Sequence, residues 1–193
     1  FTKGNKKFIE SLKLQNNRGP DQTSYNLINK INFGFNRLAI IDLSKKSMQP
    51  FFFKEYLIVF NGEIYNYKTL KKGLEKNFTF KSKGDAEVFL KTIIHYGPEK
   101  GIKKLRGMWS CIIYNKKNGE FIVSRDRIGI KPLWYYVEEN KFIFSTDIRS
   151  ITSLVNKKNI NKKIFINFLK YGFLDEEDDT FFTNIKTFPK GCY

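Results

Sequence analysis

The sequence predicts a layered α+β domain in which helices cover antiparallel strands. Short apolar, β-branched runs joined by hairpin-type turns dominate its second half, while other segments repeat apolar residues at three- and four-residue intervals. No strand-helix-strand alternation persists, which argues against a doubly wound parallel sheet. With 193 residues, 41% of them hydrophobic, the chain can bury a sizeable core, and a single domain is predicted.

The predicted strands are apolar runs bounded by turn residues. Residues 56–60 and 108–114 are typical of buried strands, and Asn118-Gly119 separates the second run from residues 120–124. Both turn residues tolerate positive φ, so a tight hairpin is predicted there. A second hairpin is predicted, with strands at residues 133–137 and 141–145 joined by a polar corner at residues 138–140. Apolar spacing predicts helices at residues 7–14, 68–76, 85–95 and 163–171.

The net charge of +16 raises the question of a nucleic-acid or membrane partner. Only six of the 35 cationic residues are arginines, and the lysines are spread along the whole chain. This pattern favours a solvated surface over a polyanion site, so neither nucleic acid nor membrane is predicted as a partner. A basic nucleic-acid-binding module, which needs its lysines on one face, is the least favoured alternative.

Cysteine and histidine are too sparse for a metal site or a disulfide framework. Cys111 and Cys192 lie far apart, and the single histidine, His95, has no metal-type neighbour. The sequence opens on no secretory signal and contains no apolar run long enough to cross a bilayer. A reducing cytoplasm is the predicted compartment.

Arg37 is a candidate for binding a carboxylate. It precedes the four apolar residues 38–41 and Asp42, so we expect a fixed cation at the head of an apolar strand. A guanidinium there can bind a carboxylate with two parallel hydrogen bonds. From this residue alone, a surface arginine paired with a neighbouring acid is the favoured alternative.

Asn61, Gly62 and Glu63 place an amide donor, an accessible backbone N–H and a carboxylate within three residues. This combination can form an oxyanion hole beside an acceptor for an ammonium group. Read locally, Asn-Gly is more often a turn. Asp85 heads a predicted helix, where it can either cap the helix or bind an amine.

Taken together, the motifs resemble the class II glutamine amidotransferase (glutaminase) domain of glutamine-hydrolysing asparagine synthetases. The segments that carry the resemblance, in order and spacing, are residues 18–21 (Arg-Gly-Pro-Asp), 37–42, 48–50 (Met-Gln-Pro), 61–66, 85–88, 105–109 and 125–133. They span nearly the whole chain. The resemblance implies an N-terminal-nucleophile hydrolase fold, a four-layer αββα sandwich of two antiparallel sheets.

The resemblance also implies the residues of a glutamine pocket. Arg37 would hold the α-carboxylate, and Glu63 with Asp85 the α-ammonium group. Asn61 and the Gly62 N–H would form the oxyanion hole. The pocket lining would come from the backbone of Leu38, Ala39, Ile40 and Ile41. A zwitterionic amino acid needs both charge signs around its α-carbon, and this set supplies them. Outside the pocket, Cys111 is predicted in a core strand, and Arg125 with Asp126 is predicted to form an ion pair that braces the turn at Gly129.

In the family the nucleophile is an N-terminal cysteine whose own α-amino group, with a pKa of about 7.7–8.0, acts as the general base. This sequence starts at Phe1, and residues 1–4 resemble the stretch just after the family's first strand. We therefore expect residues 1–193 to be a glutaminase domain truncated before its nucleophile and before a C-terminal synthetase domain, and inactive as such. Asn17 and Gly84 depart from the family pattern, but neither is a proposed ligand.

The implied activity is hydrolysis of L-glutamine to glutamate and ammonia. The ammonia would serve ATP-dependent asparagine synthesis from aspartate in the C-terminal domain of the same polypeptide, where ATP and Mg²⁺ are expected. The Ser-Gly-Gly-x-Asp-Ser loop of that domain is absent here, so no cofactor is predicted in this domain. A homodimer is compatible with the family. Three alternatives stay open: a different ammonia acceptor, a phosphoribosyl or sugar-phosphate amidotransferase, and a degenerate domain that only binds glutamine or a partner.

Overall fold

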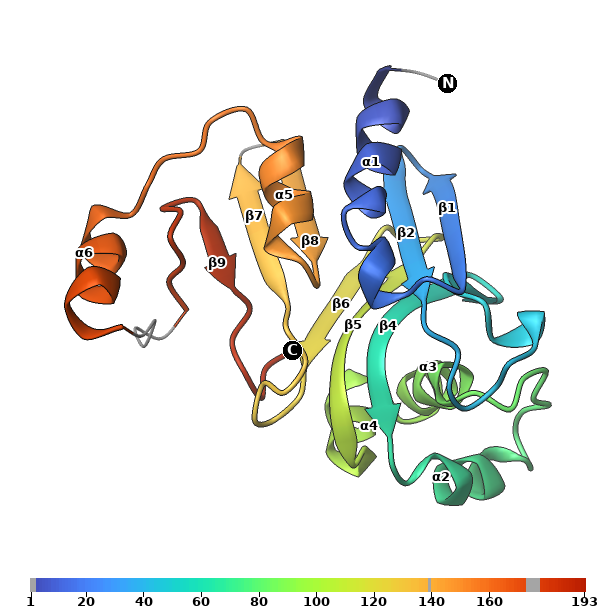
Figure 1. The fold of residues 1–193 in the computed structure, drawn as a ribbon. Helices are drawn as coiled ribbons and strands as arrows, with labels where there is room; N and C mark the ends of the chain where they lie inside the picture. Colours follow the sequence, from blue (N-terminus) through green and yellow to red (C-terminus); the bar gives the residue numbers. More distant parts are fainter. Residues whose placement is uncertain (1–2, 139, 173–177) are drawn as a thin grey trace.

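The computed structural model describes residues 3–138, 140–172 and 178–193. Every strand pair in it is antiparallel, and helices cover the sheets, so the predicted α+β class is confirmed (Figure 1). The described strands form three hydrogen-bonded sheets rather than the two expected, with orders β1-β2, β3-β4-β5-β6 and β8-β7-β9. The predicted corner at 138–140 includes residue 139, which lies outside the described residues.

The strands are β1 (Gln22–Ile28), β2 (Ile31–Arg37), β3 (Phe51–Phe53), β4 (Tyr56–Ile64), β5 (Gly107–Asn115), β6 (Phe121–Arg125), β7 (Trp134–Glu138), β8 (Lys141–Ser145) and β9 (Ile185–Thr187). The helices are α1 (Lys3–Lys13), α2 (Tyr67–Leu74), α3 (Asp85–Tyr96), α4 (Pro98–Lys104), α5 (Ile148–Leu154) and α6 (Lys162–Tyr171), with 3₁₀ turns at Asn16–Arg18 and Lys45–Ser47. All four predicted helices and both predicted hairpins are present. The strands β1, β2, β3 and β9 and the helices α4 and α5 were not predicted.

The main core lies between the four-stranded sheet and α3. Phe60 and Trp109, from β4 and β5, pack against Phe89 of α3, with ring centroids 5.5 and 6.0 Å from it. Residues 85–93 of α3 are all buried, the polar ones included. Two of its buried charges, Glu87 and Lys91, are matched to each other, because Lys91 Nζ lies 2.5 Å from Glu87 Oε1 one turn away.

The β1-β2 hairpin turns at Asn29 and Lys30, which both have positive φ. Two such residues suit the tight turn that joins twisted antiparallel strands. A lysine rarely adopts this conformation, so Asn29-Lys30 was a weak signal for the turn. Helix α1 then packs on β2, where a side chain at Gly34 would collide with Leu12.

Helices α1 and α5 pack side by side, α1 over β2 and α5 over β8 (Figure 1). Their contact is partly polar: Ser150 Oγ donates to the Ser11 carbonyl over 2.8 Å, and Gln15 Nε2 donates to Ser150 Oγ over 2.8 Å. The strands β2 and β8 belong to different sheets. The two helices therefore bridge a break between the β1-β2 hairpin and the β8-β7-β9 sheet.

Residues 38–41 do not continue a strand, which corrects the prediction of a strand after Arg37. Strand β1 begins at Gln22, the register partner of Arg37, so β2 has no partner strand beyond that point. Pro20, two residues before β1, has no N–H to offer a ladder. Leu38 and Ile40 are accordingly 56% and 72% exposed.

Arg125 and Asp126 brace the turn at Gly129 separately, not as the predicted ion pair. The Arg125 guanidinium donates to the carbonyls of Gly129, Lys131 and Phe188. The Asp126 carboxylate accepts backbone N–H bonds from Trp109, Ile128, Ile130 and Lys131. Each charge is thus satisfied by backbone groups, which sequence spacing does not reveal.

Candidate functional site

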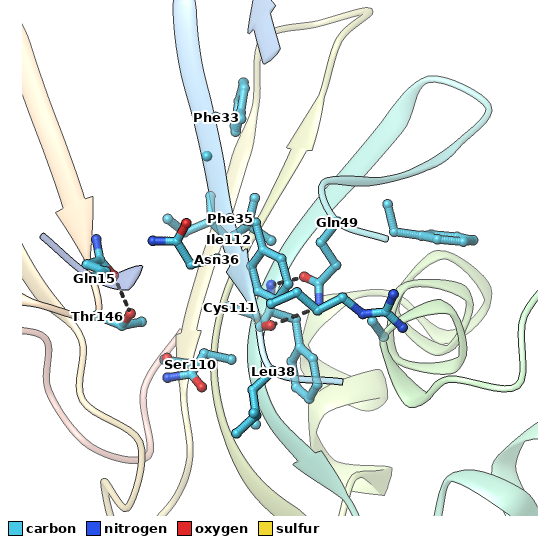
Figure 2. Close-up of a pocket in the computed structure, with 18 of the residues that line it drawn as sticks. Gln15, Phe33, Phe35, Asn36, Leu38, Gln49, Ser110, Cys111, Ile112 and Thr146 are labelled. Atoms are coloured by element: carbon cyan, nitrogen blue, oxygen red, sulfur yellow. Dashed lines mark hydrogen bonds between the residues drawn. The ribbon is translucent and has the colours of Figure 1, made fainter. Parts of the chain in front are cut away.

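A cavity of about 370 Å³ lies beneath α1 and α5, at the break between β2 and β8 (Figure 2). Its walls come from β2, the loop after β2, β4, β5, β8, both helices and the start of α3. The lining includes every residue that the sequence predicted for a glutamine pocket: Arg37, Leu38, Ala39, Ile40, Ile41, Asn61, Gly62, Glu63 and Asp85. These nine predicted residues, which lie up to 48 positions apart in the sequence, therefore meet in one cavity.

Arg37 is the buried cation of this cavity, with a side chain only 6% exposed at the end of β2. Its guanidinium Nη2 donates to the carbonyl of Asp42. That bond curls residues 38–41 around the arginine. One bond uses one of the five guanidinium N–H groups, which leaves capacity for a carboxylate.

Two aspartates hold the loop around Arg37. Asp21 Oδ2 accepts from Ala39 N over 2.7 Å, and Asp42 Oδ2 accepts from Lys83 N over 2.8 Å. Burial by itself would raise the pKa of Asp42, but the Ser47 hydroxyl and the N–H groups of Lys83 and Ser44 outweigh burial and hold this pKa well below its ordinary value. Asp42 is therefore ionised at neutral pH and anchors the loop to the segment before α3.

Gly62 lies inside β4, so the local interpretation of Asn61-Gly62 as a turn is wrong. A Cβ at Gly62 would lie 2.2 Å from the Met108 carbonyl oxygen of β5, which explains the glycine. Its register partner Trp109 directs its own N–H and C=O to Asp126 on the far side. Gly62 and Trp109 thus face each other as a non-hydrogen-bonded pair, and the Gly62 N–H points to the edge of β4 away from β5.

Asn61 supplies a second donor beside Gly62. Its Nδ2 is buried and has no hydrogen-bond partner within the described residues. The same holds for Oγ of Ser110, its register partner on β5. Buried polar atoms are nearly always paired, so two unpaired ones lining the same cavity indicate a place for a polar ligand.

Asp85 and Glu63 supply the negative side of the cavity. Asp85 is 8% exposed, and its Oδ2 accepts from Ile64 N over 2.8 Å. Burial is the main reason that the pKa of Asp85 is raised, and the nearby charge of Glu63 adds to it. A cation between these two carboxylates would relieve both the burial and the repulsion.

Cys111 also lines the cavity but is poorly suited to act as its nucleophile. It lies in β5, 2% exposed, as predicted for a core strand. Burial raises the pKa of its thiol far above the ordinary value. A thiol that stays protonated at neutral pH is a weak nucleophile.

Sequence reasoning assigned no role to Asp21, Asp42, Gln49 or Ser110, all of which support or line the site. Asp21, Asp42 and Gln49 belong to motifs that carried the family resemblance, and their presence in these motifs could have indicated that they support the site. Ser110 carried no signal, because only the register of β4 against β5 brings it beside Asn61.

Among the described residues, no group of three or more His, Cys, Asp or Glu side chains could hold a metal ion, and no helix there is long and apolar enough to span a bilayer.

The fold and the cavity together define an α+β domain whose pocket is lined by a buried arginine, two carboxylates and, among the described residues, the unpaired amide of Asn61. Its fold is that of an amidotransferase: glutamine phosphoribosylpyrophosphate amidotransferase from B. subtilis superimposes with a TM-score of 0.55 and 22% identity, over 63% of this chain and 28% of that one. The glutamine amidotransferase domain family matches residues 2–193. The chain belongs to this family, as a class II domain.

Its curated relatives include glutamine-hydrolysing asparagine synthetases. One from Bacillus subtilis is 38% identical over 82% of this chain, and one described as putative from Methanocaldococcus jannaschii is 38% identical over 81%. An amidase, chry2, from Gibberella zeae is 37% identical over 72% of the chain. The chain spans 25%, 34% and 21% of the lengths of these three relatives.

Proposed function

We propose that this domain binds L-glutamine and, in the intact protein, hydrolyses it to glutamate and ammonia. The observation that carries the proposal is that one cavity is lined by a buried cation and by two carboxylates. Arg37 suits the α-carboxylate, and Asp85 with Glu63 suits the α-ammonium group. Residues 38–41 line the space between, and Asn61 and Gly62 lie where a side-chain amide oxygen can reach their free donors.

In the proposed reaction a cysteine thiolate attacks the side-chain amide carbon of glutamine. The C–S bond forms as the carbonyl oxygen becomes an oxyanion, which Asn61 Nδ2 and the Gly62 N–H stabilise. The C–N bond then breaks, and ammonia leaves with the proton that the cysteine's α-amino group took from the thiol. Water hydrolyses the thioester and releases glutamate.

We propose that the nucleophile enters the cavity on an extended segment that precedes Phe1. The break between β2 and β8 is roofed by α1 and α5 and floored by β4 and β5, so it has the shape of a strand position. A strand there would join the β1-β2 hairpin to the β8-β7-β9 sheet. The result would be the four-layer αββα sandwich of two antiparallel sheets, with the cysteine beside Asn61 and Gly62.

The ammonia acceptor lies outside this domain. Because the chain spans a quarter to a third of the length of its asparagine-synthetase relatives, we propose that a C-terminal domain of the same polypeptide binds ATP and Mg²⁺ and amidates aspartate in the cytoplasm. The similarity to amidase chry2 is nearly as strong. It favours, as a second candidate, a domain that releases ammonia to a different acceptor.

Calorimetry of glutamine binding tests the proposal. We expect Arg37→Ala and Asp85→Asn each to weaken binding at least 10-fold, because each leaves one charge of the zwitterion unmatched. Arg149→Ala and Asp179→Asn change the same residue types at ion pairs outside the cavity lining and should leave binding unchanged. Binding that survives both cavity variants would refute the residue roles, and glutamine binding without hydrolysis in the full-length protein would point to a noncatalytic domain.

A further inference from the structure

The edge of β4 beside the cavity carries three backbone N–H groups in a row. Phe60, Gly62 and Ile64 alternate along the strand, so their N–H groups point to the same edge. Strand β3 covers this edge up to Ile58, its last partner being Phe51. Beyond that point the edge would be bare, and its donors would need other acceptors.

Two side chains take the place of the missing strand. The side-chain amide of Gln49 pairs with both backbone groups of Phe60: Oε1 accepts from Phe60 N over 2.6 Å, and Nε2 donates to Phe60 O over 3.0 Å (Figure 2). Asp85 Oδ2 accepts from Ile64 N. Gly62 lies between these two fixed points, and within the described part of the chain no acceptor is found for its N–H.

Gln49 is itself held in place. Its side chain is 7% exposed, and its backbone carbonyl accepts from Ser24 Oγ of β1. Its amide extends the ladder by one residue pair, because Gln49 would face Phe60 if the register of Phe51 with Ile58 continued. The amide thus imitates a peptide unit at the last position before Asn61 and Gly62.

We propose that Gln49 is a positioning residue for the oxyanion hole. By fixing both backbone groups of Phe60 it sets the path of β4 two residues before Gly62, and hence the direction of the Gly62 N–H. This inference rests on the proposed glutaminase function. It assigns Gln49 an effect on the reacting amide oxygen and none on the α-carboxylate or α-ammonium group, which other residues bind.

The test is steady-state glutaminase kinetics of the full-length protein with Gln49→Met, which keeps the side-chain length but removes both hydrogen bonds. We expect kcat to fall about 10- to 100-fold, because an oxyanion donor displaced by a fraction of an ångström loses much of its effect. KM and the calorimetric affinity for glutamine should stay within about 3-fold, since the charged contacts persist.

Asn66→Ala is the matched control. The Asn66 side-chain amide also pairs with two backbone groups, Lys104 O and Arg106 N, each over 2.9 Å, but beyond the end of β4. Removal of this amide should leave kcat unchanged. An equal loss of kcat in Asn66→Ala and Gln49→Met would reduce Gln49 to a general stabiliser and overturn the inference.

The pH dependence of kcat in Gln49→Glu distinguishes a positioning role of Gln49 from a purely structural one. A protonated carboxyl group has one acceptor and one donor and can replace the amide, whereas a carboxylate would face the Phe60 carbonyl with like charge. We expect the kcat of Gln49→Glu, relative to the parent at the same pH, to rise as pH falls. A ratio independent of pH, or a Gln49→Met enzyme with parental kcat, would overturn the inference while the parent's activity upheld the proposed function. A parent that does not hydrolyse glutamine would overturn both.

Discussion

At the scale of single residues, the charge of Asp85 lowers the stability of the folded chain but favours the binding of a cationic ligand. Its carboxylate is buried and repelled by Glu63, which raises its pKa and makes ionisation unfavourable in the folded chain. The same isolated negative charge is what an α-ammonium group would bind. Residues at binding sites commonly lower stability in this way, because the ligand supplies the missing partner.

Asp85→Asn should therefore stabilise the chain at neutral pH. The pKa of Asp85 has its ordinary value of 3.8 in the unfolded chain and is raised in the folded one. The folded state therefore holds the proton to higher pH, and the parent loses stability as pH rises from the ordinary pKa through the raised one. Asparagine keeps an acceptor for Ile64 N–H and does not titrate. Calorimetric scans should show equal midpoints near pH 4 and a midpoint a few degrees higher for Asp85→Asn at pH 8. A lower midpoint at pH 8 would contradict the cost assigned to this charge.

At the scale of elements, α3 is a helix buried on its polar side as well as its apolar side. Glu87 accepts from the backbone N–H of Lys81 and Ser82, and Lys91 donates to Glu87 and to the Thr79 carbonyl. Burial by itself would raise the pKa of Glu87, but Lys91 and these N–H groups keep it lowered. The pair thereby fixes the segment before α3, which also holds Asp42 through Lys83 N.

Lys91→Met should destabilise the chain by about 3–5 kcal/mol, because it leaves the Glu87 carboxylate buried without its cation. Both side chains of this pair are 1% exposed. Lys103→Met provides the matched control: it removes a partner of Glu99 at the same four-residue spacing, but those side chains are 72% and 63% exposed. Urea unfolding should show a large shift for the first variant and no measurable shift for the second. Similar small shifts in both would contradict the importance of burial.

At the scale of the whole molecule, the cavity lies between the β1-β2 hairpin and the β8-β7-β9 sheet, which the predicted sandwich would join into one sheet. Helices α1 and α5 contact each other on one side of this break, and the four-stranded sheet lies on the other side (Figure 1). An extended segment in that position would satisfy strand edges on both sides and occupy the part of the cavity between β2 and β8, leaving the part beside Arg37 and Asp85 for glutamine. Folding stability and catalysis would then depend on the same segment.

If the proposed segment precedes Phe1, a protein that includes it should unfold at a higher temperature than residues 1–193, since the segment would bury surface that is otherwise left in the cavity. An electrophilic glutamine analogue should label it at a single upstream cysteine, as mass spectrometry can locate. Cys111 should stay unlabelled, because its protonated, buried thiol is unreactive. Labelling of Cys111, or an unchanged unfolding temperature, would contradict this placement.

The sequence by itself determined the α+β class, four of the helices and both hairpins of the second half, because apolar periodicity and polar turns are local properties. Motif order also indicated the family and nine of the residues that line the cavity. Tertiary structure decided what local patterns could not. It made Asn61-Gly62 a strand rather than a turn, because β5 and the side chains of Gln49 and Asp85 hold both of its edges. It made residues 38–41 a loop, because β1 begins opposite Arg37 and offers no partner beyond it, and it gave Arg125 and Asp126 backbone partners instead of each other. Each of these outcomes depends on a partner distant in the sequence, and hydrogen-bond partners at long range leave no periodic signal in the chain.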